Sequence, residues 1–262
     1  MKDLNICLFS ETLGRGIPVR CLVPEGNNLK CLFLLHGFGG NQNQWCDESI
    51  IILLVKQYGL AVVMPHCGNG YYEDTNEDMP YFVGSELVSY IRKVLPVSNK
   101  KVDTYIAGVS MGGFGALLIG AKFSNVFGKI VSLSGAFIIP DVVIGNAGVL
   151  GNADPDYFRR VFGDFDTLEG SSKDPLAEAI SASAKGNLLV IFLLCGSDDV
   201  LYQGNLKVVK DLRKHNIPVV WYSYKGTHCW SFWNDSLPVI FKWLVEDYVP
   251  EGADNGYGAS HN

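Results

Sequence analysis

The segment Gly108-Val109-Ser110-Met111-Gly112 fits G-x-S-x-G, a pattern that places a serine nucleophile on a sharp turn between a strand and a helix. The apolar run 102–107 precedes it and a helical run begins near Met111, which is the context that the motif requires. Small flanking residues tolerate the strained backbone of such a turn, which lifts the hydroxyl above the sheet. The motif therefore predicts Ser110 as a nucleophile for acyl transfer.

A serine hydroxyl is a weak nucleophile at neutral pH, so it needs a histidine base that a carboxylate holds in one tautomer. In hydrolases with this turn the histidine comes last, on a loop after the final strand. His228 has that place, because it follows the apolar run 219–224. The carboxylate should leave the preceding strand, and the run 188–194 is followed closely by Asp198 and Asp199. One of these two aspartates is expected to orient His228.

Attack on a carbonyl also needs donors for the charge that develops on its oxygen. The backbone N–H of Met111, directly after the serine, is the first candidate. The second is expected from the loop after the run 30–36, which reads His36-Gly37-Phe38-Gly39-Gly40. Glycines let a backbone N–H turn inward, so we predict that Phe38 is the second donor. His36 is interpreted as a buried residue that braces this loop.

Aromatic residues gather in the same loops, and apolar pockets with a few polar groups are how proteins hold small esters. Tyr72 is the first expected substrate contact, with Trp45 and Trp230 as further ones. Trp233, one helical turn after Trp230, is expected to pack the last helix instead.

These residues need a scaffold, and short apolar runs alternate with segments of helical period along the chain. The expected strands are 5–12, 17–23, 30–36, 60–64, 102–107, 129–134, 188–194 and 219–224. The expected helices are 45–57, 81–95, 111–123, 201–215 and 230–248. This alternation predicts an α/β fold with a mostly parallel central sheet and helices on both faces.

Two segments depart from the alternation. Residues 135–186 contain several glycines and prolines but no strong strand, and we interpret them as a small cap insertion over the site. Residues 251–262 have little to bury and are expected to form a flexible tail. Residues 1–250 are therefore expected to form a single domain.

The composition excludes several classes of protein. The chain has 262 residues, 48% of them hydrophobic, which is typical of a globular protein with a large core. Its net charge of −6 opposes binding to nucleic acid or to anionic lipid. The apolar runs are too short to cross a membrane and no signal peptide is visible, so we expect a cytoplasmic protein.

The seven cysteines are odd in number and include no CxxC pair, which predicts reduced thiols and no zinc or other metal site. The chemistry described above needs no cofactor. The expected partner is a small-molecule ester, and nothing in the sequence indicates an oligomeric state.

The same residues carry a family resemblance. The motifs that carry it are, in order, HGFGGNQNQW, VVMPHCGNGYYEDT, YIAGVSMGGFGA, SLSGAF, CGSDDVLY and GTHCWSFW. They resemble the tributyrin esterase group within the esterase D and S-formylglutathione hydrolase-like branch of the α/β hydrolases, over most of 31–243 but weakly in the cap. The segment His66-Cys67-Gly68 and Glu73 depart from the small polar residues expected there, which bears on leaving-group specificity.

The resemblance implies an α/β-hydrolase fold and a short-acyl carboxylesterase with Ser110, His228, an aspartate of CGSDD, and the donors Phe38 and Met111. Asp199 is chosen over Asp198 because the acid follows the glycine of the G-x-x-D pattern by three residues. A helix that starts soon afterwards lets this carboxylate accept backbone N–H bonds and stay ionised.

Two other functions fit the same residues. The enzyme could deacylate a thioester such as S-formylglutathione, or remove acetyl or feruloyl groups from polysaccharide, with unchanged nucleophilic machinery. A hydrolase fold that has lost its chemistry and only binds a ligand would lack a residue of the triad. All the required residue types are present here in order, which favours an enzyme.

Overall fold

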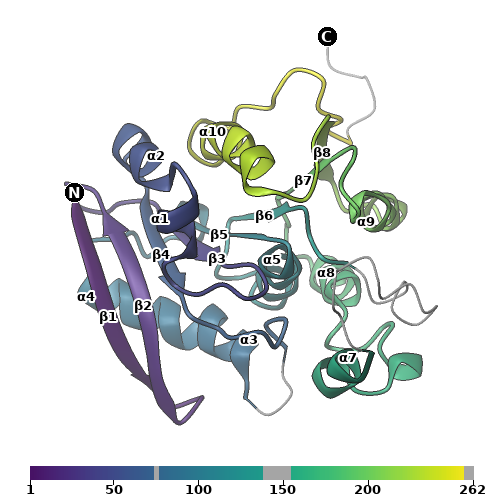
Figure 1. Cartoon of the computed structure of the whole chain (residues 1–262), viewed down its shortest axis with the longest axis horizontal. Coiled ribbons are helices and arrows are strands. Elements are labelled where there is room, and N and C mark those ends of the chain that lie inside the picture. Colours follow the sequence, from purple (N-terminus) through teal and green to yellow (C-terminus); the bar gives the residue numbers. More distant parts are fainter. Residues whose placement is uncertain (74–76, 138–154, 257–262) are drawn as a thin grey trace.

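An eight-stranded sheet forms the centre of the computed structural model, which describes residues 1–73, 77–137 and 155–256 (Figure 1). The strands are β1 (Lys2–Ser10), β2 (Arg15–Val23), β3 (Cys31–Leu35), β4 (Ala61–Pro65), β5 (Thr104–Val109), β6 (Lys129–Leu133), β7 (Ile191–Gly196) and β8 (Val219–Tyr224). Their order across the sheet is β1-β2-β4-β3-β5-β6-β7-β8. The pairs β1–β2 and β2–β4 are antiparallel and all other pairs are parallel, which confirms the predicted α/β class.

The central strands β3, β4 and β5 are buried at every residue. A strand with helices on both faces reads as an unbroken apolar run, because neither face meets water. β5 lies between β3 and β6. Since these three strands are parallel, their carboxyl ends meet at one edge of the sheet, and the segment after β5 has the loops after β3 and β6 as neighbours.

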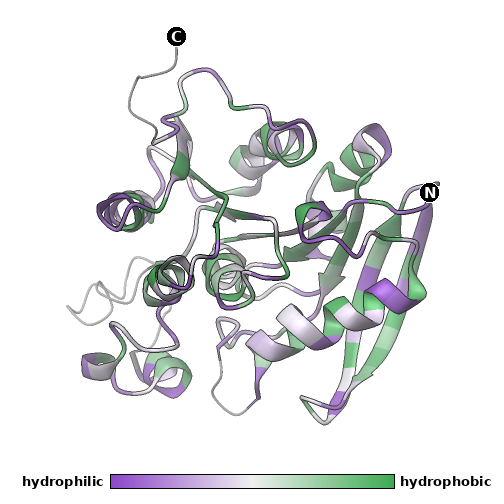
Figure 2. Ribbon diagram, turned by 180° about the vertical axis from the view of Figure 1, so that it is seen from behind, coloured by the Kyte–Doolittle hydropathy of each residue, from purple (hydrophilic) through white to green (hydrophobic). Residues whose placement is uncertain are grey.

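Helices cover both faces of the sheet (Figure 1). The α-helices are α1 (Gln44–Glu48), α2 (Ile51–Tyr58), α3 (Met79–Tyr81), α4 (Val88–Val94), α5 (Met111–Lys122), α7 (Pro155–Phe162), α8 (Pro175–Ala184), α9 (Tyr202–Lys214) and α10 (Trp230–Glu246). A π-helix η1 (Phe82–Leu87) and 3₁₀ turns η2 (Lys101–Asp103) and η4 (Phe165–Thr167) complete the set. Helices α1, α2 and α10 pack on one face, and α4, α5, α8 and α9 on the other. Figure 2 shows the apolar colouring concentrated along the strands and the sheet-facing sides of the helices.

Two of the expected helices are not continuous. The expected helix 45–57 divides into α1 and α2 because Ser49 adopts an extended conformation, with φ −134° and ψ 168°, that ends the first helix. The expected helix 81–95 starts earlier, at α3, and passes through η1 before it continues as α4. In both cases the element type was predicted correctly and its regularity was not.

The expected cap and tail differ from the structure in part. Residues 138–154 of the expected cap lie outside the described residues, and the rest of it is largely helical. Of its helices, α8 packs against α5 and so belongs to the layer that covers the sheet. Helix α7 lies at the periphery of the molecule, farther from the sheet (Figure 1).

The chain after α10 returns to the edge strand β8. Asp254 and Trp221 exchange two backbone hydrogen bonds of 2.7 and 2.8 Å, and Arg213 forms an ion pair of 2.7 Å with Asp254. Residues 251–256 are therefore anchored, and the remainder of the expected tail lies outside the described residues. In the described part of the chain, no helix has the length and apolar character needed to span a membrane.

Candidate active site

Ser110 lies on the turn between β5 and α5, with φ 56° and ψ −117°. A non-glycine residue in such a conformation costs roughly 1–3 kcal/mol and persists only where its surroundings force it. Close packing forces it here. A Cβ atom at Gly108 would lie 2.2 Å from the carbonyl oxygen of Gly112, and one at Gly112 would lie 2.5 Å from that of Leu35. Both flanking positions of the motif therefore require glycine.

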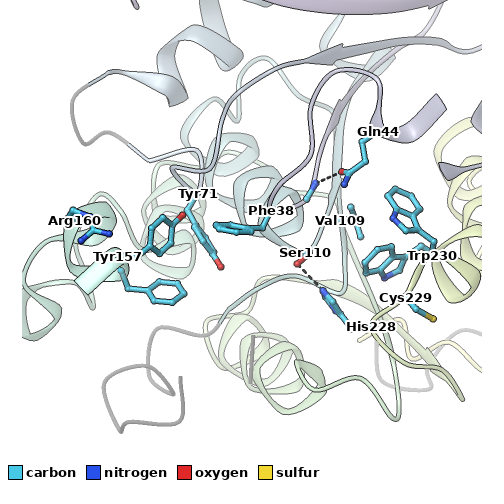
Figure 3. Close-up of a pocket in the computed structure, with 13 residues that line it drawn as sticks. Phe38, Gln44, Tyr71, Val109, Ser110, Tyr157, Arg160, His228, Cys229 and Trp230 are labelled. Carbon is cyan, nitrogen blue, oxygen red and sulfur yellow. Dashed lines mark hydrogen bonds between the residues drawn. The ribbon is translucent and has the colours of Figure 1, made fainter. Parts of the chain in front are cut away.

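Ser110, His228 and Asp199 form a hydrogen-bonded chain. His228 Nε2 lies 3.0 Å from Ser110 Oγ, a contact drawn in Figure 3. His228 Nδ1 lies 3.1 and 3.0 Å from the two carboxylate oxygens of Asp199. A carboxylate only accepts hydrogen bonds, so Nδ1 carries the proton and Nε2 is left to accept the serine proton. This is the geometry of a nucleophile and an oriented general base.

Asp199 is the aspartate that the structure brings to His228. It is 5% exposed, and Oδ1 also accepts the N–H of Leu201 at 2.8 Å. Burial alone would raise the pKa of Asp199, but the hydrogen bonds from His228 and Leu201 outweigh it and hold this pKa below its ordinary value. Asp198 is exposed and its backbone N–H donates to the carbonyl of Gly226 at 2.9 Å.

The loop after β3 leaves one N–H group available at the site. The N–H of Gly37 donates to Gln44 Oε1 at 3.0 Å, a bond drawn in Figure 3, and that of Gly39 donates to Asn69 Oδ1 at 2.8 Å. The N–H of Phe38 donates to no other residue in the described part of the chain. Phe38 lines the same cavity as Ser110, so its N–H group is suited to bind a substrate oxygen there.

The N–H of Met111 has the same property. It begins α5 directly after Ser110, and within the described residues it donates to no protein acceptor. The first N–H groups of a helix carry a partial positive charge and suit a developing anion. The N–H groups of Phe38 and Met111, the two donors predicted from the sequence, thus both lack an acceptor among the residues that the structure describes.

His36 braces the loop, in agreement with its interpretation from the sequence. Nδ1 lies 2.8 Å from the carbonyl oxygen of Gly37, and Nε2 accepts the N–H of Cys67 at 3.0 Å. Both bonds exist only for the neutral ring with its proton on Nδ1. Burial lowers the pKa of His36 to about 4, which keeps the ring in this form.

Ser110 opens into a cavity of about 690 Å³ (Figure 3). Figure 3 shows Trp230 on one side of Ser110 and Tyr71, Tyr157 and Arg160 on the other. The lining residues are mostly apolar or aromatic: Gly37, Phe38, Gln44, Tyr71, Val109, Ser110, Tyr157, Phe158, Arg160, His228, Cys229, Trp230 and Trp233. Such a cavity suits a small, largely apolar ligand.

Two of the three expected substrate contacts do not line this cavity. Tyr72 is fully buried and its hydroxyl donates to the carbonyl of His36 at 2.9 Å, so the prediction of Tyr72 as a contact is wrong. Trp45 is likewise buried, and its Nε1–H donates to the carbonyl of Leu35 at 3.1 Å. Trp45 instead supports the ring of Trp230, at 5.3 Å between centroids. Of the three, only Trp230 lines the cavity.

Several lining residues were missed from the sequence. Gln44 carries no recognisable signal, because only the folded loop shows what its amide reaches. The sequence of α7, by contrast, does indicate an apolar helix face, because Phe158 and Phe162 lie four residues apart beside Tyr157. This helix lies inside the segment that was interpreted as a cap insertion. Metal-ligating side chains do not gather in groups of three or more anywhere in the described residues.

Comparison with known proteins identifies the family. A family model described as putative esterase matches residues 10–244. An acetyl esterase from Caldicellulosiruptor saccharolyticus is 35% identical, over 93% of this chain and 98% of that protein. The chain belongs to this esterase family. It is therefore an enzyme that hydrolyses carboxylic esters.

Solved structures agree on the fold. An S-formylglutathione hydrolase from Staphylococcus aureus superposes with a TM-score of 0.83 at 24% identity, covering 93% of this chain and 98% of that one. A ferulic acid esterase superposes with a TM-score of 0.79 at 22% identity, covering 94% and 97%. The esterase thus has the α/β-hydrolase fold predicted from the sequence.

The contacts of the two aspartates lead to opposite expectations. Asp199→Asn should lower kcat by on the order of 10³–10⁴, because an amide can donate to His228 and so favours the wrong tautomer. Asp198→Asn should change kcat by less than about tenfold, since its side chain is exposed. Rates with p-nitrophenyl acetate and melting temperatures of both variants measure this. A larger loss at Asp198 would show that the acid is misassigned.

His36 should make stability depend on pH. Its pKa is about 4 in the folded protein against an ordinary 6.5, so the unfolded chain binds the proton more readily. The free energy of unfolding should fall as pH decreases from about 6.5 towards 4, by up to about 1.4 kcal/mol per pH unit from this residue.

The comparison that isolates His36 uses His36→Asn, which cannot titrate. Urea unfolding between pH 7 and 5 should show a less stable variant with a shallower dependence on pH than the wild type. Equal slopes in the two proteins would contradict the assignment. The range stays above the pH at which most carboxylates take up protons.

Proposed function

We propose that this esterase hydrolyses short-chain acyl esters through an acyl-enzyme on Ser110, with His228 as general base, Asp199 as its orienting carboxylate, and Phe38 and Met111 as oxyanion donors. This would place it in the tributyrin esterase group. The observation that carries the proposal is the hydrogen-bonded chain from Asp199 to Ser110 at a cavity beside the lone N–H of Phe38.

Acylation follows from this geometry. Ser110 Oγ attacks the ester carbonyl as its proton passes to His228 Nε2, 3.0 Å away. The carbonyl oxygen becomes an oxyanion that the N–H groups of Phe38 and Met111 stabilise. His228 then gives its proton to the leaving alcohol oxygen as the bond to the carbonyl carbon breaks. Asp199, held ionised, stabilises the imidazolium between the two transfers.

Deacylation repeats the sequence with water. A water molecule in the place of the alcohol loses a proton to His228 and attacks the acyl carbon. The oxyanion forms at the same two donors. As it collapses, the bond between the acyl carbon and Ser110 Oγ breaks and His228 returns the proton to Oγ. The products are the carboxylic acid and the free serine.

The side of the cavity next to Trp230 supports a short acyl group. Trp230 and Trp233 lie 5.0 Å apart between ring centroids, and the buried Trp45 packs behind Trp230. Val109 adds a further apolar surface. This wall is mostly apolar, and Trp45 fills the space behind Trp230, so it suits an acyl chain of about two to four carbons. The acetyl esterase relative fits that range.

A cytoplasmic location stays a prediction.

A covalent label tests the nucleophile. An organophosphorus fluoride should add one phosphoryl group to the wild-type enzyme, because attack on phosphorus needs the same activated serine. Intact-mass spectrometry should detect no adduct on Ser110→Ala, and this variant should lose at least about 10³-fold in the rate with p-nitrophenyl acetate. A Ser110→Ala protein that keeps its adduct and its rate would overturn the proposal.

Esters of different acyl length test whether the Trp230 side of the cavity binds the acyl chain. Across p-nitrophenyl acetate, butyrate and octanoate, kcat/KM should be higher for the two short esters. Trp230→Ala should raise the ratio of kcat/KM for octanoate to kcat/KM for butyrate, because it removes a ring that limits the space for the acyl chain. Trp230→Phe, which keeps a ring, should change this ratio less. A higher kcat/KM for octanoate than for butyrate in the wild type would contradict the proposed short acyl chain. It would not affect the assignment of Ser110 as the nucleophile, which the covalent label tests.

A further inference from the structure

Tyr71 is a buried side chain whose hydroxyl has no hydrogen-bond partner among the described residues. The residue is 2% exposed. It lines the cavity, and Figure 3 shows the hydroxyl turned towards the space beside Ser110. A hydroxyl that faces a cavity and has no partner among the described residues is available to bind a ligand there.

The ring of Tyr71 is held rigidly. Its backbone has φ +55°, which is strained for a tyrosine. Phe114, Phe158 and Phe162 surround the ring edge to face, at 5.7, 5.8 and 5.2 Å between centroids. Such packing prevents the ring from turning its hydroxyl elsewhere. Burial also raises the pKa of Tyr71, so the group stays a protonated donor.

The two sides of the cavity differ in polarity and in openness. The Trp230 side is apolar and backed by the buried Trp45. On the Tyr71 side, Phe38 is 55% exposed and Arg160 is also exposed, so this side meets solvent. The apolar acyl group fits the Trp230 side, where Trp230 is half-buried and Trp45 behind it is fully buried. The alcohol half of the ester, which must be released, fits the open side.

We propose that the Tyr71 side binds the leaving group, and that Tyr71 hydrogen-bonds a hydroxyl of an alcohol that carries several, such as a sugar. The proposal rests on the esterase function proposed above and names its substrate class. The ring of Phe38, which is 55% exposed and packs on Tyr157 at 5.6 Å between centroids, can cover the apolar face of a sugar ring. The Tyr157 hydroxyl is already used, because it donates to the carbonyl of Asn69.

A matched pair of substrates tests this. A methyl glucopyranoside carrying one acetyl group and cyclohexyl acetate share the acyl group and a six-membered ring, but only the first has free hydroxyls. Tyr71→Phe should lower kcat/KM for the sugar ester by about three- to tenfold, the effect of one neutral hydrogen bond. Its kcat/KM for cyclohexyl acetate should change by less than about twofold.

Tyr157→Phe is the matched control. It makes the same chemical change in the same wall, but at a hydroxyl that the protein already binds, so the ratio between the two substrates should stay as in the wild type. Melting temperatures confirm that both variants are folded.

Equal losses on both substrates in Tyr71→Phe, or none on either, would overturn the proposal. So would a wild-type preference for S-acetylglutathione, which has no alcohol hydroxyls, over the sugar ester. Failure of the proposed function itself looks different: hydrolysis of both acetates would then persist in Ser110→Ala.

Discussion

The backbone of Ser110 is the constraint on which the rest of the site depends. A φ of +56° at a non-glycine residue is unfavourable by itself, and it holds because β5 and α5 meet with no room for a Cβ atom at Gly108 or Gly112. The strand supplies rigidity because it lies between β3 and β6, buried on both faces. The strain is therefore supported by the centre of the sheet, which also makes the nucleophile an immobile reference point for every other group.

The hydrogen bonds of the loop after β3 show which N–H group remains for a substrate. In the loop after β3, neighbouring N–H groups are taken by Gln44 and Asn69, while His36 fixes the carbonyl of Gly37. The N–H of Phe38 is left over. The hydroxyl of Tyr71 also has no partner among the described residues, and Tyr71 lines the same cavity. Donors that face a cavity without a protein acceptor indicate where a ligand can be bound.

Local chemistry was predictable from the sequence, and side-chain direction was not. The turn at Ser110, the loop with His228 and the place of Asp199 each follow from short patterns after a strand, because the carboxyl ends of parallel strands converge. The exchange of Tyr72 for Tyr71 has a different cause. Tyr72 and Tyr71 both adopt positive φ, 59° and 55°, and only the ring of Tyr71 lines the cavity beside Ser110. Residue type does not predict such a conformation for a tyrosine, so a sequence pattern cannot show which of the two rings faces the cavity.

The wall on the proposed acyl side and the position of His228 are physically coupled. Trp233 stands edge-on to the ring of His228, 4.9 Å between centroids, and contacts Trp230, which in turn packs on Trp45. Trp233 is anchored through Nε1, which donates to Ser134 Oγ at 3.2 Å. The rings that limit the acyl space therefore also limit how far His228 can move. Enlarging this side by substitution loosens the base as well, whereas the Tyr71 side has no contact with His228 among the ring pairs of the described residues and can vary with less effect on the chemistry.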